Sequence, residues 1–152
     1  PPAYWGFMDV PVPPKPSALI GLNGLYDLPA LVYGLGESHQ QLSGVYNDLQ
    51  SIAFGQDQSA WLDASPARFS ARDIQARLGD GKGSVPSIIM LDQSPDDQLV
   101  PMDQMVRMRA LLEGCDDLQV LTGKRCVGTH AAPWEGGAII WESVMDVLPL
   151  LE

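Results

Sequence analysis

The sequence predicts an α/β fold in which helices cover a small parallel sheet. Segments typical of strands and of helices alternate along the chain in the order strand, helix, strand, helix, strand, helix, which favours right-handed crossovers onto parallel strands. The first strand segment, at 17–25, is a short and mostly apolar run without clean alternation, which is typical of a strand buried on both faces. With 152 residues, 45% of them hydrophobic, the chain has the size of about one domain.

The first half of the chain predicts a connection, one strand and one clear helix. Six prolines within residues 1–16 indicate an irregular connection, and residues 17–152 are predicted to form part of a single domain. Gly55 is placed to end a helix. The predicted elements are a strand within 17–25, a short helix or loop over 26–36, and a helix over 42–54.

The second half predicts two more strands and three more helices. Ser70 is a plausible N-cap for a helix over 70–78, and Gly114 ends an amphipathic helix over 102–113. The remaining predictions are a turn-rich stretch at 61–66, a glycine-rich loop at 79–83, strands at 87–92 and 118–122, and a helix over 137–148 that carries Ile140, Val144, Val147 and Leu148 on one face.

Charge and composition exclude several classes of protein. A net charge of −10, with only nine Lys and Arg residues, argues against nucleic acids and anionic membrane surfaces as partners. The sequence contains neither an apolar run of transmembrane length nor the features of a signal peptide. Cys115 and Cys126 flank a predicted strand, too far apart for a disulfide, and free thiols fit a reducing compartment, so we expect a cytoplasmic protein.

Asp97 and His130 are the strongest candidates for catalytic chemistry. Asp97 lies just past the carboxyl end of a predicted strand, where open α/β sheets bind their ligands. His130 follows the next predicted strand, and its ring could act as a general base that the carboxylate orients. The alternatives are that Asp97 belongs to a solvated turn and that His130 is structural or exposed.

Other polar clusters give weaker predictions. A calcium loop could be read from the acidic segment at 92–103, but position six is Asp97 instead of glycine, and no metal is expected. Its would-be ligands are Asp92, Ser94, Asp96 and Asp103. His39 lies in a polar stretch and is predicted at the surface, and the two histidines have no zinc-ligand spacing.

A nucleophile is missing from the sequence. The pattern G-x-S-x-G does not occur, and its nearest match, Gly36 to Gln40, lacks the last glycine and follows no strand. No H-G-G-G run supplies an oxyanion hole. Cys126 would share one short loop with His130, which is poor geometry for a substitute nucleophile.

The chain resembles the C-terminal half of the α/β-hydrolase fold, and within it the fungal kynurenine formamidases. In that fold the triad residues follow the chain order Ser, Asp, His, so Asp97 and His130 match its last two members. The stretches that carry the resemblance are GLYDLPAL at 24–31, AFG at 53–55 with Trp61, Ala64-Ser65-Pro66, QSPDDQLV at 93–100, and GTH at 128–130 with Trp134-Glu135.

The resemblance implies hydrolysis of N-formylkynurenine to kynurenine and formate without a cofactor. It makes Asp97 the triad acid and His130 the base. It also implies that Tyr26, Trp61 and Trp134 line a pocket for an aromatic substrate, although each of these aromatics also fits core packing. Relative to the family, the first strands, the oxyanion loop and the serine elbow are absent.

We therefore expect part of a serine hydrolase that is inactive alone and acts on a small formamide or ester. The serine is expected from an N-terminal half or a second chain, and a homodimer is a further expectation. Two alternatives remain open. One is an esterase or lactonase of the same fold, and the other is a truncated, non-catalytic chain that binds a partner through its open sheet edge.

Overall fold

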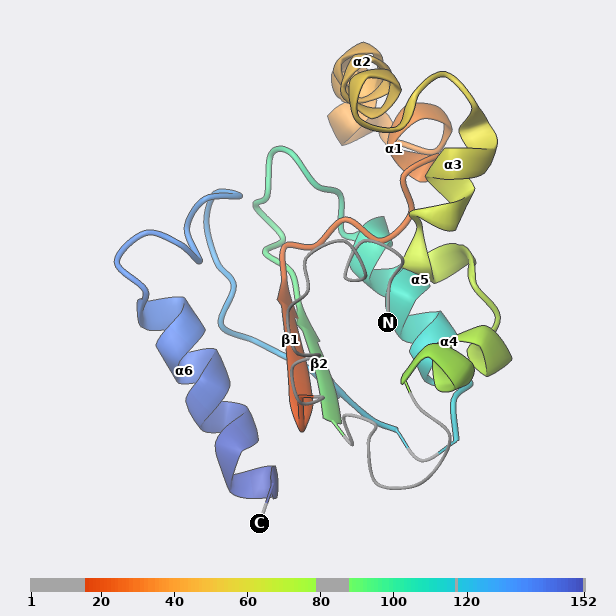
Figure 1. Ribbon diagram of the computed structural model, residues 1–152. Helices are drawn as coiled ribbons and strands as arrows, with labels where there is room; N and C mark the ends of the chain where they lie inside the picture. Colours follow the sequence, from red (N-terminus) through yellow and green to blue (C-terminus); the bar gives the residue numbers. More distant parts are fainter. Residues whose placement is uncertain (1–15, 79–87, 117, 152) are drawn as a thin grey trace, which may run out of the picture.

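A three-stranded parallel sheet lies at the centre of the structure. The computed structural model describes residues 16–78, 88–116 and 118–151 (Figure 1). The strands run in the order β1 (Ala18–Leu22), β2 (Ile88–Asp92), β3 (Gln119–Thr122), and both pairings are parallel. The predicted α/β class is thus confirmed, while the predicted connection at 1–16, apart from its last residue, and the loop at 79–83 lie outside the described residues.

Helices cover both faces of β2, which is why its sequence is apolar throughout. Ile88 and Met90 pack with Val147 of α6 (Ala138–Val147) on one face. Ile89 and Leu91 pack on the other face with α5 (Asp103–Leu112) and α4 (Ala71–Leu78). Figure 1 shows α6 on one side of the sheet and α4 and α5 on the opposite side. A strand buried on both faces cannot show the polar alternation of a half-exposed strand.

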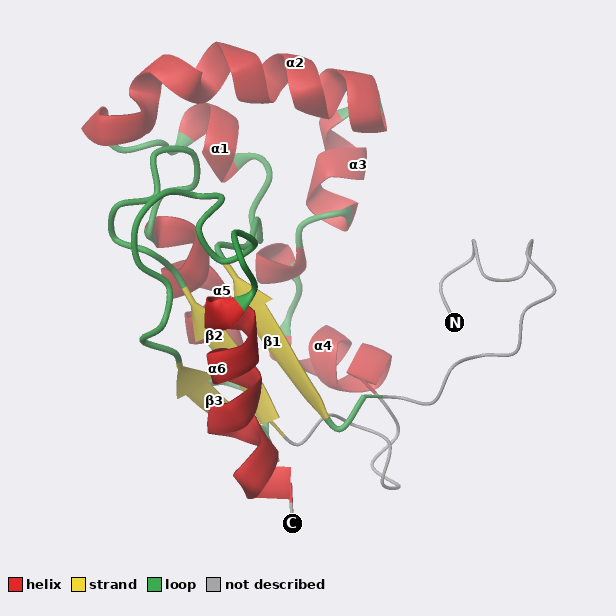
Figure 2. Ribbon diagram, turned by 90° about the vertical axis from the view of Figure 1, so that its left-hand side faces the viewer, coloured by secondary structure: helices red, strands yellow, loops and turns green. Residues whose placement is uncertain are grey.

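A helical segment of residues 30–68 stands above the carboxyl ends of the strands (Figures 1 and 2). It contains α1 (Ala30–Tyr33), the 3-10 helix η2 (Glu37–Leu42), α2 (Ser43–Phe54), α3 (Gln58–Asp63) and the 3-10 helix η3 (Pro66–Arg68). Gly55 ends α2 with φ +81°, as its position predicts.

The turn predicted at 61–66 is wrong over its first residues, which are helical. The Asp57 carboxylate accepts a hydrogen bond of 2.9 Å from the Ser59 amide and so caps α3, which continues to Asp63. The predicted cap of α4 is confirmed, because the Ser70 hydroxyl accepts a hydrogen bond of 3.1 Å from the Asp73 amide.

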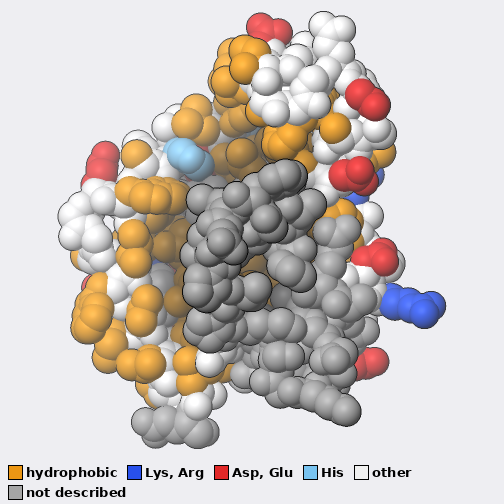
Figure 3. Space-filling view, in the orientation of Figure 1, with side chains coloured by type: hydrophobic (Ala, Val, Ile, Leu, Met, Phe, Trp, Pro, Cys, Tyr) orange, Lys and Arg blue, Asp and Glu red, His pale blue; other side chains and the backbone are white. Residues whose placement is uncertain are grey.

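The predicted apolar face of α6 is only partly covered. Val147 is buried, whereas Ile140, Val144 and Leu148 are exposed, and a 3-10 turn over Leu148–Leu151 follows the helix. Figure 3 shows hydrophobic side chains gathered on the surface over this helix. In the described part of the chain, no helix is both long and apolar enough to cross a membrane.

A buried network of ion pairs and hydrogen bonds fixes the segment after β1 against α5. The Asp27 carboxylate is buried and lies 2.9 Å from Nε of Arg68 and 3.5 Å from Nη1 of Arg107. Gln104, also buried, accepts hydrogen bonds from the amides of Tyr26 and Asp27 and donates one to the Asp27 carbonyl. These contacts hold the entry to the helical segment 30–68 at a fixed place beside the sheet.

Candidate active site

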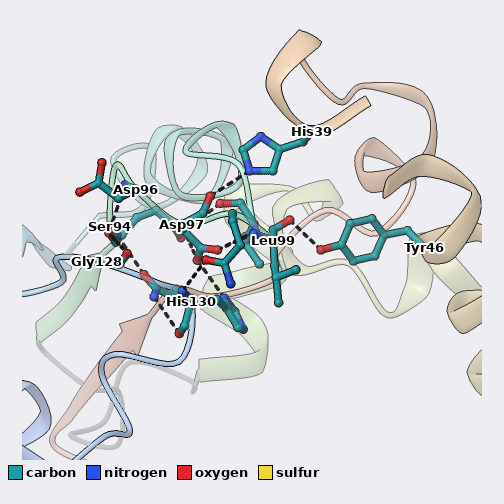
Figure 4. Close-up of polar contacts among 12 residues, drawn as sticks. His39, Tyr46, Ser94, Asp96, Asp97, Leu99, Gly128 and His130 are labelled. Carbon is teal, nitrogen blue, oxygen red and sulfur yellow. Dashed lines mark hydrogen bonds and ion pairs between the residues drawn. The ribbon is translucent and has the colours of Figure 1, made fainter. Parts of the chain in front are cut away.

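The loops that leave the three strands meet at the carboxyl edge of the sheet. The β2 loop (residues 93–102) carries Asp97, and the β3 loop (residues 123–137) carries His130. Nδ1 of His130 lies 2.8 Å from Oδ2 of Asp97 (Figure 4). The structure thus brings the two predicted site residues into direct contact, although 33 positions separate them in the chain.

Asp97 is buried, and hydrogen-bond donors surround its carboxylate. Oδ1 accepts 2.9 Å hydrogen bonds from the backbone amides of Leu99 and Val100. Oδ2 accepts hydrogen bonds from the Gln93 side-chain amide at 3.0 Å and from His130. A buried carboxylate needs such donors to offset its loss of water, and here they fix both oxygens in place.

His130 presents one ring nitrogen to the carboxylate and leaves the other free. Because a carboxylate only accepts hydrogen bonds, the contact assigns the proton of the neutral ring to Nδ1, which leaves a lone pair on Nε2. Within the described residues Nε2 makes no hydrogen bond, and the side chain is 29% exposed. The ring of Trp134 lies beside the imidazole, with centroids 5.7 Å apart. This arrangement makes Nε2 an available proton acceptor.

The helical segment 30–68 touches the β2 loop through two side chains that sequence reasoning missed. Nε2 of His39 donates a 2.9 Å hydrogen bond to the Asp97 carbonyl, and the Tyr46 hydroxyl donates one of 2.7 Å to the Leu99 carbonyl (Figure 4). The prediction of His39 as a surface residue is therefore wrong in part, because the ring is half-buried and bonded to the loop. No local sequence pattern signals either contact.

Two of the side chains that mimic a calcium loop, those of Asp92 and Ser94, form hydrogen bonds within the protein. The Asp92 carboxylate accepts hydrogen bonds from the amides of Arg125 (2.6 Å) and Cys126 (3.0 Å). Ser94 donates a 2.6 Å hydrogen bond to the Gly128 carbonyl and accepts one from the Asp96 amide. These contacts tie the β2 loop to the β3 loop. Among the described residues, no three His, Cys, Asp or Glu side chains gather as metal ligands would.

Neither cysteine is set up for nucleophilic chemistry. Cys115 and Cys126 are both free thiols and buried, as the predicted absence of a disulfide between them requires. Burial, and then the nearby Asp92 carboxylate, raise the pKa of Cys126 to about 12. The thiolate is the reactive form, so this cysteine is a poor substitute for a serine.

The three aromatics assigned to a substrate pocket lie in different places. Trp134 is 55% exposed beside His130, and lines an open groove of ≈ 320 Å³ between β1 and α6. Tyr26 is half-buried and lies so close to Gly24 that a Cβ there would meet its ring. Trp61 is buried in α3 and donates a hydrogen bond of 2.9 Å to the Gly55 carbonyl. Only Trp134 contacts the Asp97–His130 pair among these three.

The fold and site together define an α/β protein with a carboxylate–imidazole pair at the carboxyl edge of its sheet. The chain is 30% identical over 109 residues to a kynurenine formamidase of Aspergillus versicolor, a match that covers 68% of the chain and 38% of the relative. It is 29% identical over 125 residues to a kynurenine formamidase-like hydrolase of Fusarium equiseti, with 81% and 38% covered.

These matches make the chain a distant homologue of fungal kynurenine formamidase-like hydrolases. The chain spans about 38% of the length of each relative. No family model matches the sequence, and no solved structure matches it.

Proposed function

We propose that the chain is the part of a serine hydrolase that holds the acid and the base of its catalytic triad. The observation that carries this proposal is the 2.8 Å contact between Nδ1 of His130 and the buried Asp97 carboxylate, together with the unbonded Nε2. That is the arrangement that an imidazole needs to take a proton from a serine hydroxyl. Homology to hydrolases supports the same reaction class.

In the proposed reaction, a serine oxygen attacks the formyl carbonyl carbon while Nε2 of His130 takes the hydroxyl proton. The protonated ring then gives that proton to the leaving amine nitrogen, the C–N bond breaks, and a formyl-serine ester remains. Water attacks this ester with His130 again as the base, and formate leaves. Asp97 keeps the ring oriented and stabilises the imidazolium at each stage.

The proposed substrate is an aromatic formamide, with N-formylkynurenine converted to kynurenine and formate and no cofactor required. The names of the two relatives support this choice. The exposed face of Trp134, next to His130, offers an apolar surface for an aromatic ring. Of the other two aromatics that the resemblance assigns to the pocket, Trp61 has its ring buried in α3 and Tyr26 packs against the core, so Trp134 is the one we propose as a substrate contact.

We propose that the serine and the oxyanion hole come from an N-terminal segment outside these 152 residues or from a second chain. Within the described residues β1 pairs with β2 alone, and we propose that its other edge takes a further strand. A strand added there parallel to β1 would end at the same edge of the sheet as the Asp97–His130 pair. The two free, buried thiols fit a reducing compartment such as the cytoplasm.

The proposal is tested with the isolated chain and with the complete hydrolase. We expect no turnover of N-formylkynurenine or of a nitrophenyl ester by the isolated 152 residues. In the complete hydrolase, Asp97→Asn should lower kcat by about 10⁴-fold, and His130→Ala by a similar factor. An isolated chain whose turnover is abolished by His130→Ala, or a complete hydrolase that keeps its activity without His130, would overturn the proposal.

A substrate panel distinguishes the open alternatives. Preference for formamides over esters and lactones of matched size supports the formamidase, and the reverse preference supports an esterase or lactonase of the same fold. A complete protein that hydrolyses none of these substrates would favour a non-catalytic chain.

A further inference from the structure

Asn23 occupies an unusual position directly after β1. It has a φ of 47°, which is uncommon for any residue other than glycine, and it is only 3% exposed. Its amide donates a 2.9 Å hydrogen bond to the Asp92 carbonyl, which extends the contact of β1 with β2 by one residue. Its side chain therefore leaves the strand at the point where the β2 and β3 loops meet.

Both ends of the Asn23 side-chain amide are used, and each contacts a different loop. Oδ1 accepts a 2.9 Å hydrogen bond from the Ser94 amide in the β2 loop. Nδ2 donates a 3.1 Å hydrogen bond to the carbonyl of His130 in the β3 loop. One planar group thus links the loop that carries the carboxylate to the backbone of the base itself.

We infer that Asn23 is a positioning residue that holds His130 at hydrogen-bonding distance from Asp97. This inference rests on the proposed function of that pair. A hydrogen bond between two side chains leaves their backbones free to drift, whereas Asn23 fixes both loops from a third strand. A displacement of about 1 Å in such a pair can cost a hydrolase about 100-fold in rate.

Asparagine is suited to this task in a way that its closest relatives are not. Aspartate keeps the acceptor for the Ser94 amide but has no hydrogen to donate to the His130 carbonyl. Glycine adopts a positive φ without strain but has no side chain to reach either loop. Comparing these two substitutions therefore separates the amide contacts from the backbone conformation.

Two other contacts join the same loops, so loss of the Asn23 amide should loosen the pair without separating it. The Ser94 hydroxyl donates to the Gly128 carbonyl at 2.6 Å, and the Gln98 side chain accepts a 3.0 Å hydrogen bond from the His130 amide. Neither of these contacts involves β1. Asn23, directly after β1, thus links both loops to that strand.

The test is an NMR measurement on the ¹⁵N-labelled 152-residue chain. The sequence has only two histidines, so a His39→Gln variant assigns both ring signals. In the unsubstituted chain we expect the neutral His130 ring to carry its proton on Nδ1 and to exchange it slowly with water. In Asn23→Asp, which loses the hydrogen bond to the His130 carbonyl, we expect that proton to exchange about 5–10-fold faster, the factor that the loss of one hydrogen bond gives. In Asn23→Gly, which loses both side-chain hydrogen bonds, we expect the exchange to be at least as fast as in Asn23→Asp.

Asn47→Asp is the matched control, because Asn47 is a partly exposed asparagine whose side-chain amide donates to the neighbouring Asp48 side chain and to no site residue among those described. It should leave the His130 signal unchanged. If Asn23→Asp and Asn23→Gly also leave the tautomer and the exchange rate unchanged, Asn23 is a turn residue and the inference is overturned.

The readout does not depend on catalysis, so it distinguishes failure of this inference from failure of the proposed function. A hydrolase that proves inactive on every substrate can still show the Asn23-dependent signal. In an active complete hydrolase, Asn23→Asp should lower kcat by about 10–100-fold and leave KM within about two-fold, because Asn23 touches the base and not the substrate. An equal rise in KM with kcat unchanged would contradict a positioning role.

Discussion

The Asp97 carboxylate is the hydrogen-bond acceptor for both backbone and side-chain donors. It is the acceptor for the amides of Leu99 and Val100 and for the Gln93 side chain, in addition to His130. The residue is buried, so water cannot replace it as an acceptor for all of these donors. Asp97 therefore has a structural role that is separable from its proposed catalytic role.

Asp97→Ala should lower the free energy of unfolding by about 3 kcal/mol, because a buried donor left without an acceptor costs about 1–3 kcal/mol. His130→Ala should cost less than about 1 kcal/mol, since its side chain is partly exposed and its removal leaves the other donors to Asp97 in place. Urea denaturation of both variants measures the difference. Equal losses in the two variants would show that the donors around Asp97 find other acceptors.

At the scale of elements, the helical segment 30–68 and the β2 loop are joined by hydrogen bonds from side chains to carbonyls. Tyr46 in α2 reaches the Leu99 carbonyl, and His39 in η2 reaches the Asp97 carbonyl. The Leu99 carbonyl belongs to the same peptide group as the Val100 amide, which donates a hydrogen bond to the Asp97 carboxylate. Holding that carbonyl therefore also restricts a donor to Asp97. The helical segment 30–68 thereby helps to hold the β2 loop, and with it Asp97, in place.

Tyr46→Phe removes the hydroxyl but keeps the ring, and should therefore loosen the β2 loop without unfolding α2. We expect hydrogen exchange of the Leu99 and Val100 amides to accelerate by about 5-fold, as the loss of about 1 kcal/mol implies. Tyr33→Phe is the control, because the Tyr33 hydroxyl contacts Gln58 within the same helical segment and not the loop. Faster exchange in the control as well would mean that the whole segment has become less stable.

The predictable part of the structure is the part that local sequence patterns encode. Strand β2 and helix α5 follow from an apolar run and from an amphipathic period. The start of α3 is not predicted, because its signal in the sequence is a single cap, Asp57, and the strong turn residues at 64–66 follow closely.

Only the site residues that directly follow predicted strands could be predicted from the sequence. Asp97 and His130 each follow a strand, and parallel strands bring their carboxyl ends together. The contacts of Asn23 with His130 and of Gln104 with Asp27 join residues 107 and 77 positions apart. No period or spacing in the sequence marks such pairs, because the tertiary fold alone brings them together.

At the scale of the whole molecule, a tyrosine hydroxyl and a cysteine thiol inside the fold make its free energy of unfolding fall at alkaline pH. Burial raises the pKa of Tyr26 from 10.0 to about 12, and burial together with Asp92 raises that of Cys126 from 9.0 to about 12. Between about pH 9 and pH 12 the unfolded chain therefore loses protons that the folded chain keeps. Because the unfolded state then binds fewer protons, stability falls as pH rises through this window.

Urea midpoints measured at about pH 8 and about pH 10.5 should show this loss. Cys126→Ala should reduce the pH dependence, since the variant has no thiol to deprotonate on unfolding. Cys115→Ala is a weaker control for Cys126→Ala. Burial raises the pKa of the Cys115 thiol as well, so its removal should also reduce the pH dependence. A midpoint that stays constant over the window would contradict the burial of both groups.

The open edge of β1 predicts that the isolated chain associates with itself. Within the described residues β1 has a partner on one side only, and Leu19, its second residue, is 40% exposed. An unpaired edge strand with apolar side chains is a template for another strand, and natural edges are commonly protected by charge.

Sedimentation should therefore show mass rising with concentration, and Leu19→Lys should reduce that rise. Ile52→Lys also replaces an apolar side chain with lysine, at an 83% exposed position of α2, and should leave the rise intact. A monomer at every concentration would show that the edge of β1 is already protected, and an equal effect of both variants would place the contact elsewhere than the sheet.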